Sequence, residues 1–221
     1  MNPNGGGAKF LRVVGIILMS LATLFNLMGG IGSSCIAFFA EKFGPDFAAI
    51  IPYKWLYQLL VVLTTAAAVY GIYATVGLIK GTRRSYRDTL IALLTVLVFT
   101  VIQVVASRSL RGKSQPNDMR LYITVFTLLV FLVFRIPKIW QGVNFDKGAG
   151  KNTGKGGGGL VIGISLALGG LFTLLAPVMF AGTHTFGGIN YADVWHWQFM
   201  LVGGGMLAAG LAALGWLGLR A

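Results

Sequence analysis

The residues best suited to chemistry lie close together near the C-terminus. Both histidines of the 221-residue chain, His184 and His196, fall in one short stretch with Asp193. Imidazole and carboxylate groups are common ligands of zinc and copper, so His184, Asp193 and His196 form the candidate metal site. Two histidines and one aspartate are a minimal ligand set. The alternative interpretation is that they are solvated residues of a membrane interface beside Trp195 and Trp197.

The composition of the chain excludes several other classes of site. Hydrophobic residues make up 56% and charged residues only 11%, with a mean hydropathy of +0.77. A soluble domain has about 25% charged residues, so a soluble globular protein and a disordered chain are both excluded. The single cysteine, Cys35, excludes a disulfide scaffold and a Cys-rich metal site. We expect no cofactor.

Six apolar stretches are long enough to cross a membrane, because a spanning helix needs about 20 apolar residues. Their apolar runs are continuous rather than alternating, which predicts helices and not barrel strands. The sequence therefore predicts an all-α polytopic membrane protein with six transmembrane helices. The predicted spans are 13–31, 55–79, 89–107, 121–140, 160–181 and 198–219.

A glycine-rich segment divides the predicted helices into a four-helix block and a helical hairpin. Seven of the twelve residues from 148 to 159 are glycine, and glycine costs the most entropy to order. The expected organisation is an N-terminal tail (1–9), a four-helix transmembrane block (10–141), a Gly/Lys-rich linker (142–159) and a transmembrane hairpin (160–221) with an outer loop at 182–197. A second glycine-rich stretch, 29–32, is expected to end the first helix.

The distribution of basic residues predicts the orientation of the chain. Cytoplasmic loops carry an excess of Lys and Arg, and six spans place both termini on one side. That side would hold twelve of the 18 basic residues: Lys9, Arg12, Lys80, Arg83, Arg84, Arg87, Arg135, Lys138, Lys147, Lys151, Lys155 and Arg220. We expect both termini in the cytoplasm of a prokaryotic cell, with the protein in its inner membrane. The net charge of +12 is then a topology signal, and no nucleic-acid partner is expected.

Part of this basic side could also bind lipid. A basic residue near a membrane surface contributes about 1 kcal/mol of attraction to anionic headgroups. The alternative is that these charges only set the topology. The candidate anionic-lipid contacts are Lys80, Arg83, Arg84, Arg87, Lys147, Lys151 and Lys155.

Small residues predict how the last two helices pack. Small side chains at a spacing of four let membrane helices approach closely, although they are also common in membrane helices generally. One predicted face consists of Gly163, Ala167 and Gly170, and the facing one of Gly204, Ala208, Ala212 and Gly215. Two amides, Asn26 and Gln103, are expected to be buried. They are interpreted as interhelical hydrogen-bonding residues, with ligand binding as the alternative.

Three functions are compatible with these features. The expected interiors of the spans hold no Asp, Glu, Lys or His, which argues against proton coupling and favours a non-catalytic accessory or assembly subunit of a larger membrane complex. Its partners would be membrane lipids and another membrane protein or a second copy of the chain. The alternatives are an uncoupled small-solute transporter or channel, and a membrane enzyme that uses the histidine cluster at the outer face.

Overall fold

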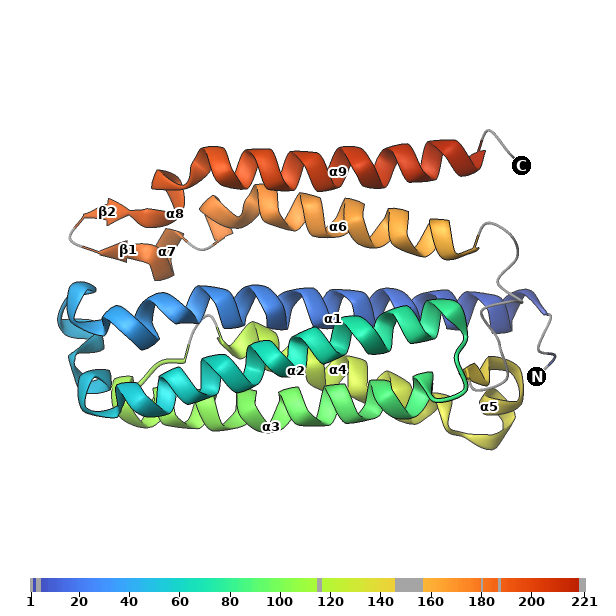
Figure 1. The fold of residues 1–221 in the computed structure, drawn as a ribbon, viewed down its shortest axis with the longest axis horizontal. Coiled ribbons are helices and arrows are strands. Elements are labelled where there is room, and N and C mark those ends of the chain that lie inside the picture. The colour runs from blue at the N-terminus through green and yellow to red at the C-terminus, as the bar shows by residue number, and fades with distance from the viewer. Residues whose placement is uncertain are drawn as a thin grey trace.

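The computed structural model describes residue 2 and residues 5–114, 117–145, 157–179, 181–186 and 188–218. Six helices in this part of the chain are long and apolar enough to cross a membrane. The prediction of an all-α polytopic membrane protein is therefore confirmed. In Figure 1 the long helices run side by side along the longest axis of the molecule.

Four of the long helices form an antiparallel block in which each helix packs on its neighbours in the chain, and the fourth also packs on the first. Continuous apolar sequence forms these helices because a spanning segment must satisfy its backbone hydrogen bonds internally. Left-handed glycines, Gly81 and Gly112, end the second and third helices. The helices of the block are α1 (Gly6–Phe39), α2 (Lys54–Lys80), α3 (Ser85–Arg111) and α4 (Asn117–Phe134).

The two ends of the molecule differ in their connecting segments. Two 3₁₀ helices, η1 (Ala40–Lys42) and η2 (Pro45–Tyr53), join α1 to α2 at the end that we call distal. The opposite end, which we call proximal, carries the start of α1 and the short helix α5 (Pro137–Val143). Under the orientation expected from the basic residues, the distal end faces outward.

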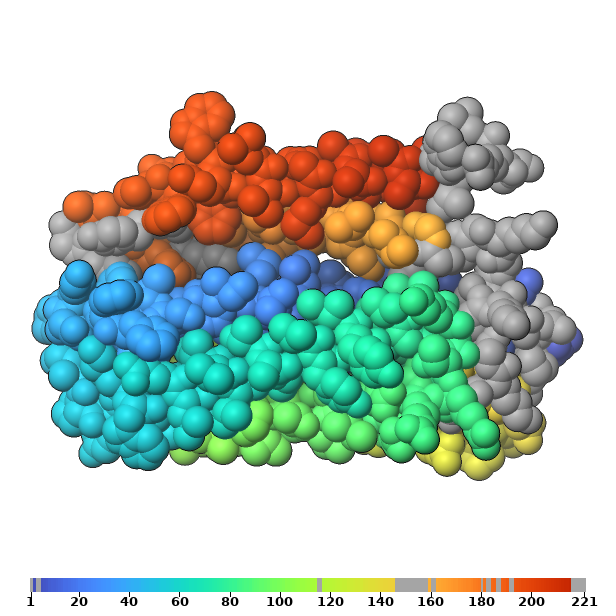
Figure 2. Space-filling view, viewed as in Figure 1, coloured from blue at the N-terminus to red at the C-terminus, as the bar shows by residue number. Residues whose placement is uncertain are grey.

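The C-terminal hairpin lies along the block rather than inside it. Its first long helix contacts α1 and its second packs on the first, at the edge of the molecule (Figures 1 and 2). A small antiparallel ladder closes the hairpin at the distal end, pairing Thr185 with Asn190. The elements are α6 (Gly157–Met179), α7 (Ala181–His184), β1 (Thr185–Phe186), β2 (Ile189–Asn190), α8 (Tyr191–Val194) and α9 (His196–Gly218).

The interior of the block changes character along its length. Buried apolar and aromatic side chains fill its proximal half, including Met19, Leu78, Leu93, Phe131 and Phe145. Arg12, Ser85, Asp88 and Thr89 are also buried at the proximal end, but a larger group of buried polar side chains lies farther toward the distal end. They include Asn26, Thr64, Thr100, Gln103, Arg120, Thr124 and Thr127. The distal half of the block therefore has a polar interior inside an apolar shell.

Several expected span boundaries differ from the observed ends of the helices. Helix α1 continues through residues 29–32 to Phe39, because Gly30 provides room for Thr65 of α2 at a helix crossing and not a break. Helix α4 ends at Phe134 instead of residue 140, since Pro137 cannot continue it and starts α5. Helix α6 begins at Gly157, three residues before the expected start.

The predicted small-residue face of α6 lies against α9, but the predicted face of α9 does not lie against α6. Cβ atoms built at Gly163 and Gly170 would meet backbone atoms of α9. On α9 the contact residues are Gly203, Leu207, Gly210 and Leu214. A Cβ atom built at Gly204 or Gly215 would meet no other described part of the chain within 4 Å, and Ala208 and Ala212 are exposed. Both faces of α9 contain small residues at helical spacing, so the spacing alone does not show which face packs on α6.

A candidate binding cavity at Arg120

Arg120 is a buried cation near the distal end of the block. It lies one turn into α4, and only 3% of its surface is exposed. Its side chain crosses directly over Gly29 of α1, where a Cβ would overlap Arg120 Cδ and Nε. The glycine therefore makes the space that lets a guanidinium group enter between α1 and α4.

Three amide side chains, one each from α1, α3 and α4, converge on this guanidinium. Arg120 Nη1 donates hydrogen bonds to Asn117 Oδ1 at 3.1 Å and to Gln103 Oε1 at 3.3 Å, and Nε donates to Asn26 Oδ1 at 3.4 Å. Asn26 is fixed in turn by donating from Nδ2 to Thr124 Oγ1 at 2.8 Å. Both amides that the sequence analysis expected to be buried are thus brought together by one arginine. Each of them is 2% exposed.

The charge of Arg120 has no anionic counterpart among the described residues. Four acidic residues form ion pairs with other bases, at Glu41–Lys54, Asp46–Lys113, Asp88–Arg87 and Asp118–Arg108. Asp193 is exposed on α8, and Asp146 lies outside the described residues. The neighbours of Arg120 are neutral amide oxygens, and its Nη2 atom is buried without a hydrogen-bond partner.

Arg120 lies well below the distal ends of the helices around it. Gly29 comes ten residues before the end of α1, which is about 15 Å along the helix axis, and Gln103 lies eight residues, or about 12 Å, before the end of α3. An arginine at that depth cannot be treated as a loop residue. Ionisable groups inside membrane bundles face the interior or a cavity and mark functional sites.

Arg120 is among the residues that line a cavity of about 560 Å³ between the block and the hairpin. Phe25 of α1 and Phe172 of α6, whose ring centroids are 4.3 Å apart, form part of its wall. The remaining lining is mainly apolar and comes from α1, the 3₁₀ helices and the distal parts of α6 and α9. Ligand cavities typically measure 300–1,000 Å³ and combine an apolar lining with a few placed polar groups, and this cavity has that composition.

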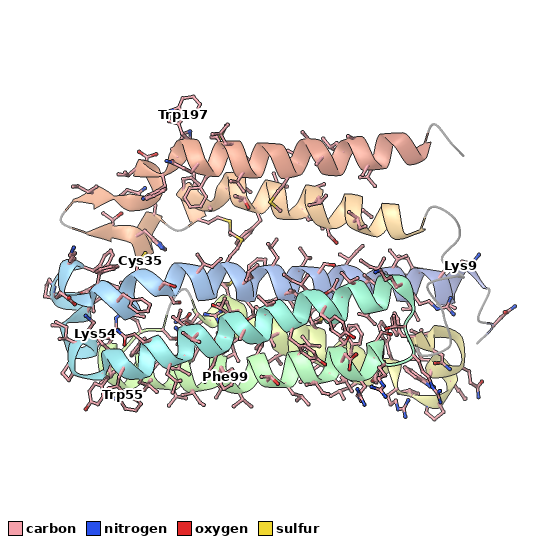
Figure 3. The ribbon with its side chains drawn as sticks, viewed as in Figure 1. Lys9, Cys35, Lys54, Trp55, Phe99 and Trp197 are labelled. Carbon is pink, nitrogen blue, oxygen red and sulfur yellow. The ribbon has the colours of Figure 1, made fainter. Side chains whose placement is uncertain are left out.

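Two other reactive or charged groups line the same cavity. Cys35, the single thiol of the chain, lies on α1 toward the distal loops of the hairpin (Figure 3). Arg111 is already engaged, since its guanidinium stacks 4.0 Å from the ring centroid of Phe47 and Nε donates to Asp46 O at 3.1 Å. Arg120 differs from Arg111 in that its Nη2 atom is buried and has no hydrogen-bond partner among the described residues.

The structure does not bring the three predicted metal ligands together. His184 ends α7 and lines the Arg120 cavity, whereas Asp193 and His196 are exposed on α8 and at the start of α9. No group of three His, Cys, Asp or Glu side chains in the described part of the chain is arranged to hold a metal ion. The His196 ring lies beside Trp197, with centroids 6.4 Å apart.

The basic residues of the α2–α3 turn lie apart from this cavity. Lys80, Arg83, Arg84 and Arg87 are all exposed at the proximal end. Lys147, Lys151 and Lys155 lie outside the described residues. Arg12, which the sequence analysis counted only as a topology signal, is buried in α1, and its Nε donates to Val143 O at 2.9 Å.

Sequence analysis missed Arg120 because the apolar run of α4 starts at the next residue. The predicted span therefore began at residue 121 and left Arg120 in a loop. A second signal was present in the spacing of Asn117, Arg120, Thr124 and Thr127, which occupy one helical face. Extending that polar stripe by one turn would have placed Arg120 on the face that holds the buried threonines.

Comparisons of the chain with protein families, curated proteins and solved structures give no match. The functional argument therefore rests on the geometry of the cavity itself.

Proposed function

We propose that this protein is a non-catalytic membrane protein that binds a single-chain amphiphile in the Arg120 cavity. The observation that supports the proposal is a buried arginine in the lining of a mainly apolar cavity. Its Nη2 atom has no hydrogen-bond partner among the described residues. A polar group at one point and apolar walls elsewhere complement a molecule with a polar head and a hydrocarbon tail. A solute that is polar throughout would leave most of the lining without favourable contacts.

The position of the cavity also supports an amphiphile from the membrane. Its walls come both from the block and from the hairpin that lies beside the block. The hairpin contacts the block mainly through α6, which packs on α1 and to a smaller extent on α2. Lipid-phase molecules would reach a cavity at this junction without passing through water.

The native thiol provides a direct test of this function. Cys35 lines the cavity and is accessible to reagents, so an occupant should slow its alkylation by iodoacetamide. The protein would be placed in phosphatidylcholine nanodiscs and labelled with and without added lauryl alcohol or lauric acid. We expect at least one of them to slow labelling in a saturable manner. Labelling at the same rate with both amphiphiles at all concentrations would refute the function.

The accessory-subunit hypothesis keeps independent support from α9. In its most apolar stretch only 11% of residues are buried, against 33–44% in the other five long helices. The exposed side of α9 carries Ala208 and Ala212, and Trp197 projects away from the rest of the molecule (Figure 3). Small residues on an exposed helix would permit close approach of a spanning helix from another membrane protein.

Particle mass tests the accessory-subunit hypothesis. Complexes extracted from native membranes in mild detergent should be larger than one chain, and Ala208→Trp should reduce them to the single-chain mass. Val98→Trp is the matched control, because Val98 is exposed on α3 and remote from α9. Single-chain particles for the unmodified protein would exclude a stable complex.

A further inference from the structure

We propose that the ligand of the Arg120 cavity carries an acidic head, and that it is a long-chain carboxylic acid bound as its carboxylate. This inference rests on the proposed function and specifies the substrate class of the same cavity. A neutral amphiphile, such as an alcohol or a quinone, would satisfy the apolar walls equally well. The distinction between these ligands depends on the charge balance around Arg120.

The first step concerns the charge. A buried cation without an anion is unfavourable, because the desolvation penalty of an ionised group remains large even after the surroundings relax. The described acidic residues leave Arg120 unpaired, since four are bound to other bases and Asp193 is exposed. A bound carboxylate would supply the missing negative charge at the position where it stabilises the protein most.

The second step concerns the donors. Amide oxygens accept hydrogen bonds from Nε and Nη1 of the guanidinium group. The remaining donor, Nη2, is buried and without a partner. A hydrogen bond from a guanidinium group to a carboxylate is about twice as strong as one between neutral groups. An alcohol or a quinone oxygen could accept from Nη2 but would leave the charge uncompensated.

The third step concerns the tail. Beyond Arg120 the cavity is lined by aromatic and aliphatic groups, among them Phe25, Ile36, Phe172 and Phe199. A long hydrocarbon chain keeps the acid in the bilayer beside the cavity and fills this apolar lining, whereas water would be a poor occupant of it. A short acid such as acetate would gain only the head-group interaction. The lining therefore favours a long chain on the same carboxylate.

A panel of four compounds separates the contributions of head and tail. Lauric acid, lauryl alcohol, lauryl trimethylammonium and acetate would be compared in phosphatidylcholine nanodiscs through protection of Cys35 from iodoacetamide. The buffer is kept near pH 9, far above the usual pKa of a carboxyl group, about 4, so that the acid is ionised. We expect lauric acid to protect at least tenfold more strongly than the alcohol, and the ammonium compound and acetate to protect weakly or not at all.

Asn117→Asp is the informative variant, because Asp has nearly the same shape as Asn. Asn117 Oδ1 already lies 3.1 Å from Arg120 Nη1, so a carboxylate there would neutralise the arginine from within the protein. The variant should be at least as resistant to thermal unfolding as the unmodified protein. Its preference for lauric acid over lauryl alcohol should nevertheless fall about tenfold or more. Loss of folding therefore cannot explain the expected loss of preference.

Two further variants locate the head group. Arg120→Gln should also remove the preference for the acid, while alcohol binding persists. Arg111→Gln is the matched control, because Arg111 lines the same cavity but is engaged by Phe47 and Asp46 O. We expect it to keep most of the preference.

The possible results separate the two proposals. Equal protection by acid and alcohol would overturn the acid inference and leave the amphiphile cavity standing. No protection by either would overturn both. A strong acid preference that survives Asn117→Asp would also overturn the inference, since the head would then lie elsewhere.

Discussion

The side chain of Arg120 crosses over Gly29 of α1. This glycine therefore sets the position of Arg120. Among the described residues, Arg120 is the only charged member of the buried polar group toward the distal end. The relationship is steric. Any side chain at position 29 larger than hydrogen would occupy the volume of Arg120 Cδ and Nε. Gly29 is therefore a packing residue of the cavity, although it stands within a helix.

Gly29→Ala should displace the Arg120 guanidinium and weaken the binding of acidic amphiphiles. We expect the protection of Cys35 by lauric acid to fall by about tenfold, which corresponds to roughly 1.4 kcal/mol. Gly32→Ala is the matched control, since Gly32 lines the same cavity and has no neighbour within 4 Å of its Cβ position. Equal behaviour of the two variants would show that the contact with Gly29 does not position Arg120.

Asn26 and Arg120 should contribute to stability as a coupled pair. Asn26→Leu removes one acceptor of Arg120 and the donor to Thr124, and buried polar groups left without partners cost about 1–3 kcal/mol. We expect Asn26→Leu and Arg120→Met to be destabilising separately and less than additive together. The measurement is a double-mutant cycle of reversible unfolding in detergent micelles. Strict additivity would mean that the two side chains do not interact energetically.

Close packing of α6 and α9 predicts a position-specific effect along α9. Gly210→Leu should lower the thermal unfolding temperature of the hairpin by several degrees, because a Cβ at position 210 already meets the Gly163 carbonyl oxygen at 2.7 Å. Gly204→Leu should have little effect, since no atom lies within 4 Å of its Cβ position. The change can be followed by circular dichroism of the purified protein. If Gly204→Leu lowered the unfolding temperature more than Gly210→Leu, then α9 would pack on α6 through the face expected from the sequence.

Arg12 should anchor α5 to the start of α1. Its guanidinium donates to the carbonyl oxygens of Gly142 and Val143, and hydrogen bonds from charged groups contribute about 1.5–3 kcal/mol each. Arg12→Met should therefore increase proteolytic cleavage in residues 137–145. Lys9→Met is the control, because Lys9 is exposed on the same helix. Unchanged cleavage in Arg12→Met would show that α5 is held by apolar packing alone.

The exposed bases of the α2–α3 turn should bind anionic lipid. Replacing Arg83 and Arg84 by Gln removes two charges that the structure places at the surface of the proximal end. At about 1 kcal/mol per residue, phosphatidylglycerol retained during purification should fall severalfold. Lipid content is measured by mass spectrometry of the extracted protein. If the amount of retained phosphatidylglycerol does not change, Arg83 and Arg84 act only as topology signals.

The sequence predicted the architecture because hydrophobicity dominates it. Six apolar runs of sufficient length are enough to establish six spanning helices, and the structure has them. The same signal failed where a polar residue belongs to a helix. Arg120 adjoins an apolar run and was assigned to a loop, and the threonines on its face were not connected with it.

The remaining differences come from interactions between distant parts of the chain. Glycine at positions 29 and 30 looked like a helix end, but Arg120 and Thr65 occupy the space it leaves. Such contacts join residues that are far apart in the sequence, such as Gly29 and Arg120, and they have no local pattern. For α9, two stripes of small residues satisfy the same spacing, so the choice between Gly203 and Gly204 depends on tertiary packing.

The unequal lengths of α1 and α4 determine how an occupant would be supplied. The 34 residues of α1 extend about 51 Å, whereas the 18 residues of α4 extend about 27 Å, close to the hydrocarbon thickness of a bilayer. If α4 spans the hydrocarbon layer from end to end, Arg120 in its first turn lies just inside the edge of the acyl chains, and η1 and η2 lie toward the headgroups. An amphiphile would enter by lateral diffusion within one leaflet. Occupancy should accordingly follow the mole fraction of that amphiphile in the bilayer, and dilution with water at constant lipid composition should leave it unchanged.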